Sequence, residues 1–435
     1  MSKGTGSFLR IAIDGFRAVH SADISLDGIT VLSGINGSGK STVSKMAYSI
    51  LKSVNEYNDL VFKYLEGRLE RIADLMDNLG FSIFADPESD DDFFSFGDFL
   101  RINSLDDLQE LSDKVNSFCE RVLDYYLNNE NEEKTGKLLR YKKMIASTLD
   151  ADSEMGFREL LNKLQDRINE EIAKAKRLVF DRPIELVDDE IKQEFEDFQK
   201  NVSLYEYGEE LYGSDINRVP IPHFVRQVFY IDTPFAVDSG TSDNWIELHH
   251  AFQHQNEFID SPLADSIAQD IIGGNAKYRG RRSFVSRYVF KDRQGREFDL
   301  EQCATGFKSF SILQMLLRNG YVKENTLLIL DEPEAHLHPQ WIIEYARIIV
   351  LIHKTIGTKF LVSSHSPDMV SAIRYIAASE DCLDHLSFYC AKEYDETPGT
   401  YSYEYIGDDI EPIFESFNMS YDRLDNYTGV VENEE

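Results

Sequence analysis

Cysteine, long apolar runs and positive charge are all scarce in this 435-residue sequence. The four cysteines form no CxxC pair, which is typical of a chain kept in a reducing compartment. The longest apolar run in a helical stretch, residues 348–352, falls far short of the ~18 residues that cross a bilayer. No charged segment leading into an apolar one follows Met1, so we expect no secretion. These features predict a cytoplasmic protein with no membrane contact.

Positive charge is the scarcest of the three, because 45 Lys and Arg face 77 Asp and Glu and leave a formal charge of −32. Like charge disfavours nonspecific attraction to nucleic acid and to anionic lipid. One segment, residues 277–296, nevertheless holds eight basic residues, among them Arg281 and Arg282. It could bind DNA through the phosphate backbone or contact a partner protein, or it could be a solvated hairpin paired with nearby carboxylates. The sequence leaves these alternatives open.

Hydrophobic residues make up 42% of the chain, which is enough for a buried core. Strand and helix patterns alternate at both ends of the sequence, which predicts an α/β fold with a mostly parallel sheet flanked by helices. The charged, glycine-poor middle predicts a large inserted acidic α-helical lobe. We expect an N-terminal part of the sheet domain at 1–54, the lobe at 55–222, a C-terminal part of the sheet domain at 223–379 and an acidic extension at 380–435.

A phosphate-binding loop stands between the first predicted strands and the first helix. Residues 34–41 match G-x-x-x-x-G-K-[ST] at every fixed position. Glycines let backbone N–H groups converge on a phosphate, Lys40 reaches the β- and γ-phosphates, and Ser41 can bind Mg²⁺. The sequence therefore predicts ATP binding by Gly34, Asn36, Gly37, Ser38, Gly39, Lys40, Ser41 and Thr42.

A second motif supports the first. Residues 326–330 form an apolar strand that ends in Asp331 and Glu332. Acidic residues at the carboxyl end of a buried strand lie at the usual ligand crevice of an α/β sheet. We expect Asp331 to hold Mg²⁺ through water and Glu332 to polarise the attacking water.

These motifs resemble those of ABC-type P-loop ATPases in the RecF, SMC and OLD branch, including standalone phage-defence ATPases such as the Septu subunit. The resemblance rests on the sequences GINGSGKS (34–41), DEPEAHLHP (331–339) and LVSSHSP (361–367). It implies that His365 lies near the γ-phosphate. It also implies a signature-like motif, in which Thr305, Gly306 and Lys308 would face the nucleotide of a partner subunit. Ala304 replaces the usual serine of that motif, which bears on the rate of hydrolysis.

The resemblance further implies a homodimer or higher oligomer that closes around ATP and Mg²⁺ and opens after hydrolysis. It suggests that the chain gates a separate effector protein, a nuclease, in antiphage defence. Only 70 residues follow His365, which is short for the nuclease domain that OLD-type proteins carry. Two alternatives stay open: a DNA-repair or chromosome-maintenance ATPase that binds DNA directly, and an ATP-dependent assembly scaffold that does not hydrolyse ATP.

Overall fold

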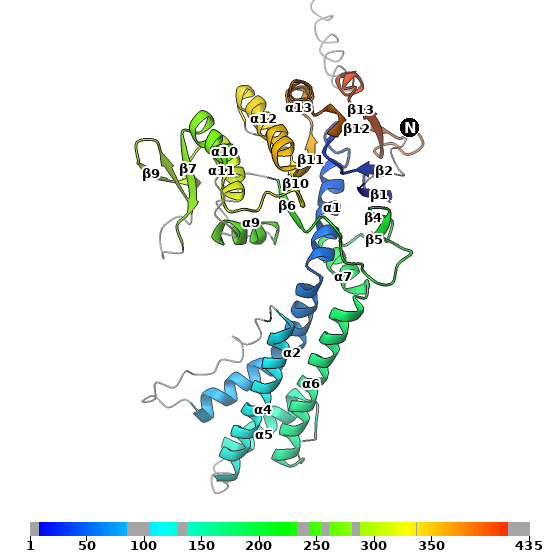
Figure 1. Cartoon of the computed structure of the whole chain (residues 1–435). Helices are drawn as coiled ribbons and strands as arrows, with labels where there is room; N and C mark the ends of the chain where they lie inside the picture. Colours follow the sequence, from blue (N-terminus) through cyan, green and yellow to red (C-terminus); the bar gives the residue numbers. More distant parts are fainter. Residues whose placement is uncertain are drawn as a thin grey trace, which may run out of the picture. The chain divides into compact units, whose positions relative to one another are not determined.

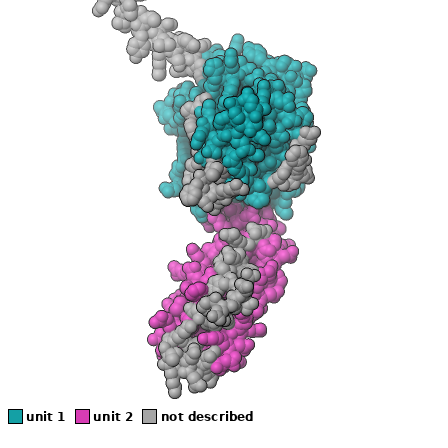
Figure 2. Space-filling model, turned by 90° about the vertical axis from the view of Figure 1, so that its left-hand side faces the viewer, with its two compact units in different colours: residues 1–55, 191–216, 220–435 teal, residues 56–190, 217–219 magenta. Residues whose placement is uncertain are grey.

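The computed structural model of the chain describes residues 8–84, 102, 104–128, 137–152, 154–232, 243–254, 261–280, 288–335 and 337–415. The chain divides into two compact units (Figure 2). The large unit comprises residues 1–55, 191–216 and 220–435, and the small unit comprises residues 56–190 and 217–219. No helix in the described ranges is both long and apolar enough to span a membrane.

A ten-stranded sheet, in the order β5-β4-β1-β2-β13-β12-β3-β11-β10-β6, forms the centre of the large unit (Figure 1). Strands β12, β3, β11, β10 and β6 run parallel, whereas β1 pairs antiparallel with both β2 and β4. The bounds are β1 (Leu9–Phe16), β2 (Val19–Ser25), β3 (Ile29–Ser33), β4 (Val202–Glu206), β5 (Glu209–Tyr212), β6 (Gln227–Ile231), β10 (Thr326–Asp331), β11 (Lys359–Ser364), β12 (Leu386–Glu393) and β13 (Tyr401–Gly407).

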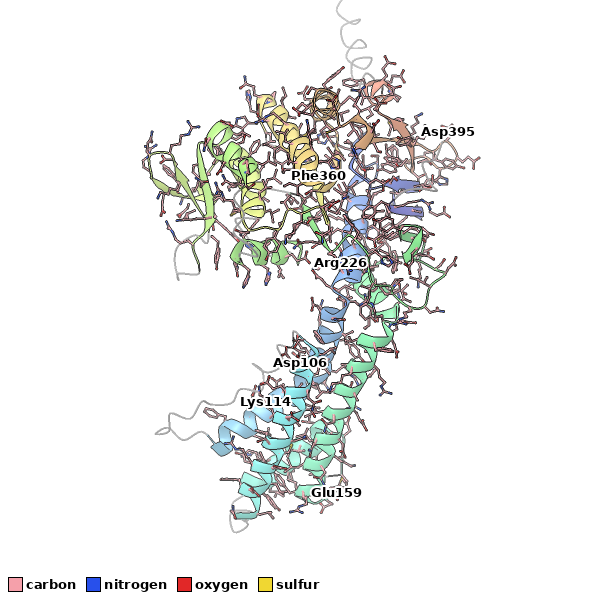
Figure 3. The ribbon with its side chains drawn as sticks, viewed as in Figure 1. Asp106, Lys114, Glu159, Arg226, Phe360 and Asp395 are labelled. Carbon is pink, nitrogen blue, oxygen red and sulfur yellow. The ribbon has the colours of Figure 1, made fainter. Side chains whose placement is uncertain are left out.

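Helices cover both faces of the parallel part of this sheet. Successive side chains of a strand point to opposite faces, so Phe229, Leu328 and Phe360 share one face and pack with α11, α12 and α13. Phe360 is labelled in Figure 3. Tyr230 points to the other face, where its ring meets Tyr48 of α1. The helices are α1 (Lys40–Asn55), α9 (Asp243–Gln253), α10 (Pro262–Ser266), α11 (Thr305–Arg318), α12 (Pro339–Ile356) and α13 (Pro367–Ser379).

A smaller antiparallel sheet lies beside α11. It has the order β7-β8-β9, with bounds β7 (Gly274–Tyr278), β8 (Tyr288–Asp292) and β9 (Glu297–Asp299). Gln314 of α11 accepts a hydrogen bond from the backbone N–H of Ala276 in β7. Short helical segments of the large unit are Ile267–Ile271, Leu300–Gln302 and Leu383–His385.

The small unit is built from helices whose apolar residues recur every three or four positions. Leu108, Leu111 and Val115 form the buried stripe of α4, and Leu160, Leu164 and Ile168 form that of α6. Charged residues such as Asp106 and Glu159, both labelled in Figure 3, occupy the exposed faces. Its helices are α2 (Tyr57–Phe84), α4 (Leu105–Asn128), α5 (Lys137–Thr148) and α6 (Phe157–Asp181), and α7 (Glu185–Glu194) crosses the division between the units.

The predicted α/β fold class, with a mostly parallel core sheet flanked by helices, is confirmed. The division into units differs from the predicted boundaries in two places. Strands β4 and β5 lie before residue 222, yet β4 pairs with β1 in the large sheet. Strands β12 and β13 lie in the predicted extension after residue 379, yet β12 pairs with β3 beside the phosphate-binding loop. Both differences arise because the added strands complete a sheet whose first strands are distant in sequence.

Candidate nucleotide-binding site

Three neighbouring parallel strands deliver the predicted motifs to one edge of the sheet. β11 lies between β3 and β10 and pairs in parallel with both. Parallel strands end at the same edge, so the loop after β3, the carboxylates after β10 and His365 after β11 converge there. The two motifs separated by about 290 residues of sequence are therefore neighbours in space.

The loop after β3 folds tightly against the start of β2. Gly39 has φ +90°, and an added Cβ would lie 2.7 Å from Cγ2 of Val19, so this position requires glycine. Ser38 and Lys40 are buried, whereas Asn36 and Gly37 are exposed at the tip of the loop. Helix α1 begins at Lys40 and continues through Ser41 and Thr42, with no acidic residue in its first turn. The positive end of its dipole is thus available to an anion.

Lys40 is held beneath the loop. Its Nζ donates hydrogen bonds to the carbonyl oxygens of Gly34 (2.8 Å) and Ile35 (3.0 Å). Burial lowers the pKa of Lys40, and the nearby carboxylates of Glu332 and Asp331 oppose this shift. The predicted phosphate ligand and the predicted catalytic carboxylates therefore face the same space.

Asp331 lies at the end of β10 and is buried. The Tyr230 hydroxyl donates to its Oδ2 at 2.7 Å, while Oδ1 is buried and has no hydrogen-bond partner among the described residues. Burial raises the pKa of Asp331, and the Tyr230 hydroxyl and the nearby Ser41 hydroxyl lower it. Proximity of Ser41 to an incompletely paired carboxylate fits a Mg²⁺ site completed by phosphate oxygens and water. The described residues offer no closed metal cage of His, Cys, Asp and Glu.

Glu332 adopts an uncommon backbone conformation for its residue type. Its φ is +50°, and its N–H donates to the carbonyl oxygen of Ser363 on β11 at 2.8 Å. Non-glycine residues in this region cost of order 1 kcal/mol and cluster at functional sites. The turn directs the side chain toward β11, where Glu332 Oε1 lies 3.3 Å from Nδ1 of His365. Both side chains are partly exposed, so a ligand can reach them.

Glu334 is a site residue that sequence reasoning missed. Its side chain is 5% exposed. Its Oε1 accepts hydrogen bonds from the Ser364 hydroxyl (2.7 Å) and the His365 N–H (3.1 Å), and it lies 3.7 Å from His365 Nδ1. Burial raises the pKa of Glu334. A glutamate three positions after Asp331, in a charged motif, is expected from sequence to be exposed to solvent. Only its burial in the structure reveals that it positions His365.

Tyr403 of β13 is a second residue missed from sequence. Its hydroxyl donates to the carbonyl oxygen of Ser38 at 3.1 Å, and burial raises its pKa. The alternation of Tyr401, Tyr403 and Tyr405 is a strand signal, but nothing in it indicates contact with a loop 365 positions earlier. The predicted C-terminal extension thus supports the phosphate-binding loop directly.

The signature-like residues stand at the start of α11. Helix α11 belongs to the core cluster on one face of the sheet, whereas α1 packs on the other face. Ala304 is the N-cap of α11 and makes no side-chain capping hydrogen bond, and Thr305 is partly exposed. Gly306 and Lys308 are buried, and a Cβ at Gly306 would lie 2.3 Å from the Trp341 ring. Thr305 is therefore the most accessible of the three to a second molecule.

In the basic segment around β7 and β8, three of the five described basic side chains form ion pairs. Lys277 and Arg279 both pair with Glu297, and Arg296 pairs with Asp292 at 2.7 Å. Arg281 and Arg282 lie outside the described residues. Neutralised side chains contribute little to attraction of DNA, so the described part of this segment favours the solvated-hairpin interpretation.

Comparison with known proteins agrees with the motifs. Residues 29–371 match the family model described as "AAA domain, putative AbiEii toxin, Type IV TA system", and the chain belongs to this family. The chain is also 31% identical over 94 residues to the Old nuclease of Escherichia phage P2, which is 22% of this chain and 14% of that protein. The predicted resemblance to the RecF, OLD and SMC branch of P-loop ATPases is confirmed. The chain spans only 14% of the length of this curated relative.

Solved structures of SMC head domains resemble this chain only weakly, in both sequence identity and TM-score. The SMC head domain of Thermotoga maritima has 12% identity and a TM-score of 0.36, covering 91% of this chain and 98% of that one. The Smc head of Pyrococcus furiosus, bound to the C-terminal domain of ScpA, has 13% identity and a TM-score of 0.32, covering 96% and 98%. The family assignment therefore rests on the sheet topology and on the match to the family model, and not on these similarities to solved structures.

Proposed function

We propose that this member of the P-loop ATPase family binds ATP with Mg²⁺ and hydrolyses it to ADP and phosphate. The convergence of Lys40, Asp331 and Glu332 at the carboxyl edge of three parallel strands carries the proposal. In the proposal, Lys40 and Ser41 bind the phosphates together with the other residues of the loop and the helix start, which are Gly34, Asn36, Gly37, Ser38, Gly39 and Thr42.

Each side chain then has a distinct role. Lys40 offsets the negative charge of the phosphates. To reach them, its Nζ gives up its hydrogen bonds to the carbonyl oxygens of Gly34 and Ile35. Glu332 accepts a hydrogen bond from the attacking water and orients it, and His365 contacts the γ-phosphate from the neighbouring strand. Glu334 is a positioning residue, because it fixes the backbone of His365 without reaching the nucleotide. Mg²⁺, held by Ser41 and Asp331 when bound, would neutralise charge that develops on the phosphates.

We further propose that two copies close around ATP and that closure gates a separate effector, a nuclease, in antiphage defence. The uncapped start of α11, with Thr305 accessible, supports a contact with the nucleotide of a second copy. A ligand shifts such an equilibrium only through different affinities for the two states, and the γ-phosphate supplies that difference. The nuclease effector is proposed from the similarity to the phage Old nuclease and from the family description.

The test uses Glu332→Gln in the full-length chain. We expect this variant to bind ATP, to hydrolyse it at least about 100-fold more slowly, and to accumulate as a dimer in size-exclusion chromatography with light scattering. Glu411→Gln, an exposed glutamate of the same unit, is the matched control and should behave like the parent. Hydrolysis by Glu332→Gln at the parent rate would refute the assignment of Glu332. A monomer in saturating ATP would refute closure of two copies.

A further inference from the structure

The small unit contains a hollow of about 620 Å³ between α2 and α5. Arg71, Leu75 and Asn78 recur at i, i+4 and i+7 and therefore line it from one stripe of α2. Residues 139–148 line it from α5 in the same way, with pairs that recur every three or four positions. The full lining is Arg71, Leu75, Asn78, Leu139, Arg140, Lys143, Met144, Ser147 and Thr148.

The charge of this hollow is opposite to that of the chain. Three cations, Arg71, Arg140 and Lys143, line it, and no carboxylate of the described residues does, although the chain carries a formal charge of −32. Helix α5 itself contains four basic residues and no acidic one. Within the described ranges these three side chains make no ion pair or hydrogen bond. Their charge is therefore available to a ligand.

A neighbouring hollow shows how the same unit neutralises cations elsewhere. That hollow shares Arg71 and Thr148 with the first but is lined by side chains of both signs. There Arg68 and Arg167 each lie 3.1 Å from Oε1 of the buried Glu171. Among the described residues, no carboxylate lines the hollow between α2 and α5, and no ion pair of Arg71, Arg140 or Lys143 is seen there.

We propose that the hollow between α2 and α5 binds a nucleoside phosphate, either free or at the end of a single nucleic-acid strand. Guanidinium groups pair with phosphate oxygens through two parallel hydrogen bonds, and the hydroxyls of Ser147 and Thr148 can add further ones. Leu75, Leu139 and Met144 supply apolar contact for a sugar or base. The volume lies within the range of small-molecule sites. The proposal is independent of the ATPase assignment, because these residues belong to the other unit.

The experiment is performed in the full-length Lys40→Ala background, so that the phosphate-binding loop does not contribute. Isothermal titration calorimetry measures binding of 5′-AMP and of a 5′-phosphorylated thymidine pentanucleotide at 50 and 200 mM salt. We expect Arg140→Glu to weaken binding at least tenfold, and higher salt to weaken the remaining affinity. Arg158→Glu, a charge reversal at an exposed arginine of α6 outside the hollow, should change it less than twofold. The stronger of the two probes identifies the source of the phosphate.

Several results would overturn the proposal. They are no measurable binding of either probe at millimolar concentration, equal effects of Arg140→Glu and Arg158→Glu, and tighter binding of a decaglutamate peptide. Binding that emerges only when Asp90, Asp91 and Asp92 are changed to Asn would assign the hollow to this acidic segment of the chain, which lies outside the described residues. If Arg140→Glu does not fold, Lys143→Gln, with an expected loss of at least threefold, replaces it.

Discussion

At the scale of single residues, the site depends on side chains and backbone whose burial, hydrogen bonding or conformation differs from that of the same residues exposed to water. Lys40 is buried among carbonyl oxygens, Asp331 keeps one buried oxygen without a partner, and Glu332 holds a left-handed backbone. Each feature costs free energy in the protein alone. A magnesium-bound triphosphate would relieve the first two, because it supplies anionic oxygens to Lys40 and a cation to Asp331.

Glu334 provides a prediction about pH. Burial raises the pKa of its carboxyl in the folded protein above the ordinary 4.5, so the folded state binds this proton more tightly than the unfolded state. The contribution of Glu334 to the free energy of unfolding therefore falls as pH rises from 4.5 through the raised value. Glu334→Gln cannot lose a proton, and its Oε1 can still accept from Ser364 and His365.

We therefore expect the stability of Glu334→Gln relative to the parent to increase with pH above 4.5 and then level off above the raised pKa, by about 1.4 kcal/mol for each unit by which that pKa is raised. Urea denaturation at pH 4.5, 6.0 and 7.5 measures this difference. Glu411→Gln, at an exposed position, should show no such trend. A difference for Glu334→Gln that stays constant or shrinks with rising pH would contradict this account of the carboxyl.

At the scale of elements, local patterns predicted the strands and helices that carry the motifs. The apolar run at residues 326–330 predicted β10 nearly at its observed bounds. Local patterns did not predict the position of a strand in the sheet when that position depends on pairing with a strand distant in sequence. β12 is apolar for most of its length, yet its place next to β3 follows from pairing across more than 350 residues of sequence. Glu334 and Tyr403 were missed for the same reason, because their hydrogen-bond partners, Ser364 and Ser38, are distant from them in sequence.

Packing between elements explains one glycine of the signature-like motif. Gly306 faces the Trp341 ring of α12 so closely that an added methyl group would overlap it. We expect Gly306→Ala to lower the free energy of unfolding by about 1–3 kcal/mol, as overpacked core substitutions do. Chemical denaturation of the full-length chain measures this loss.

A double-mutant cycle separates packing from other effects. In a Trp341→Ala background the ring is gone, and Gly306→Ala should then cost less than about 0.5 kcal/mol. An equal loss in both backgrounds would show that contact with Trp341 does not set the need for glycine at this position.

At the scale of the whole molecule, the chain combines a large unit with the predicted ATP site and a small helical unit with a cationic hollow. The net charge of −32 makes long-range attraction of nucleic acid unfavourable, so any such contact must be local. Sequence motifs predicted the chemistry of the large unit. They gave no indication of the hollow, because its cations come from two helices about 70 positions apart and match no motif.

The central claim is that Lys40 and Asp331 meet around a magnesium-bound triphosphate, and ATP binding tests it most directly. Isothermal titration calorimetry of the full-length chain with ATP and Mg²⁺ compares the parent with Lys40→Ala and with Lys323→Ala, a control near the opposite end of β10. We predict that Lys40→Ala loses at least about 30-fold in affinity, that EDTA weakens binding to the parent, and that Lys323→Ala matches the parent. Equal affinity of the parent and Lys40→Ala for ATP would contradict the account.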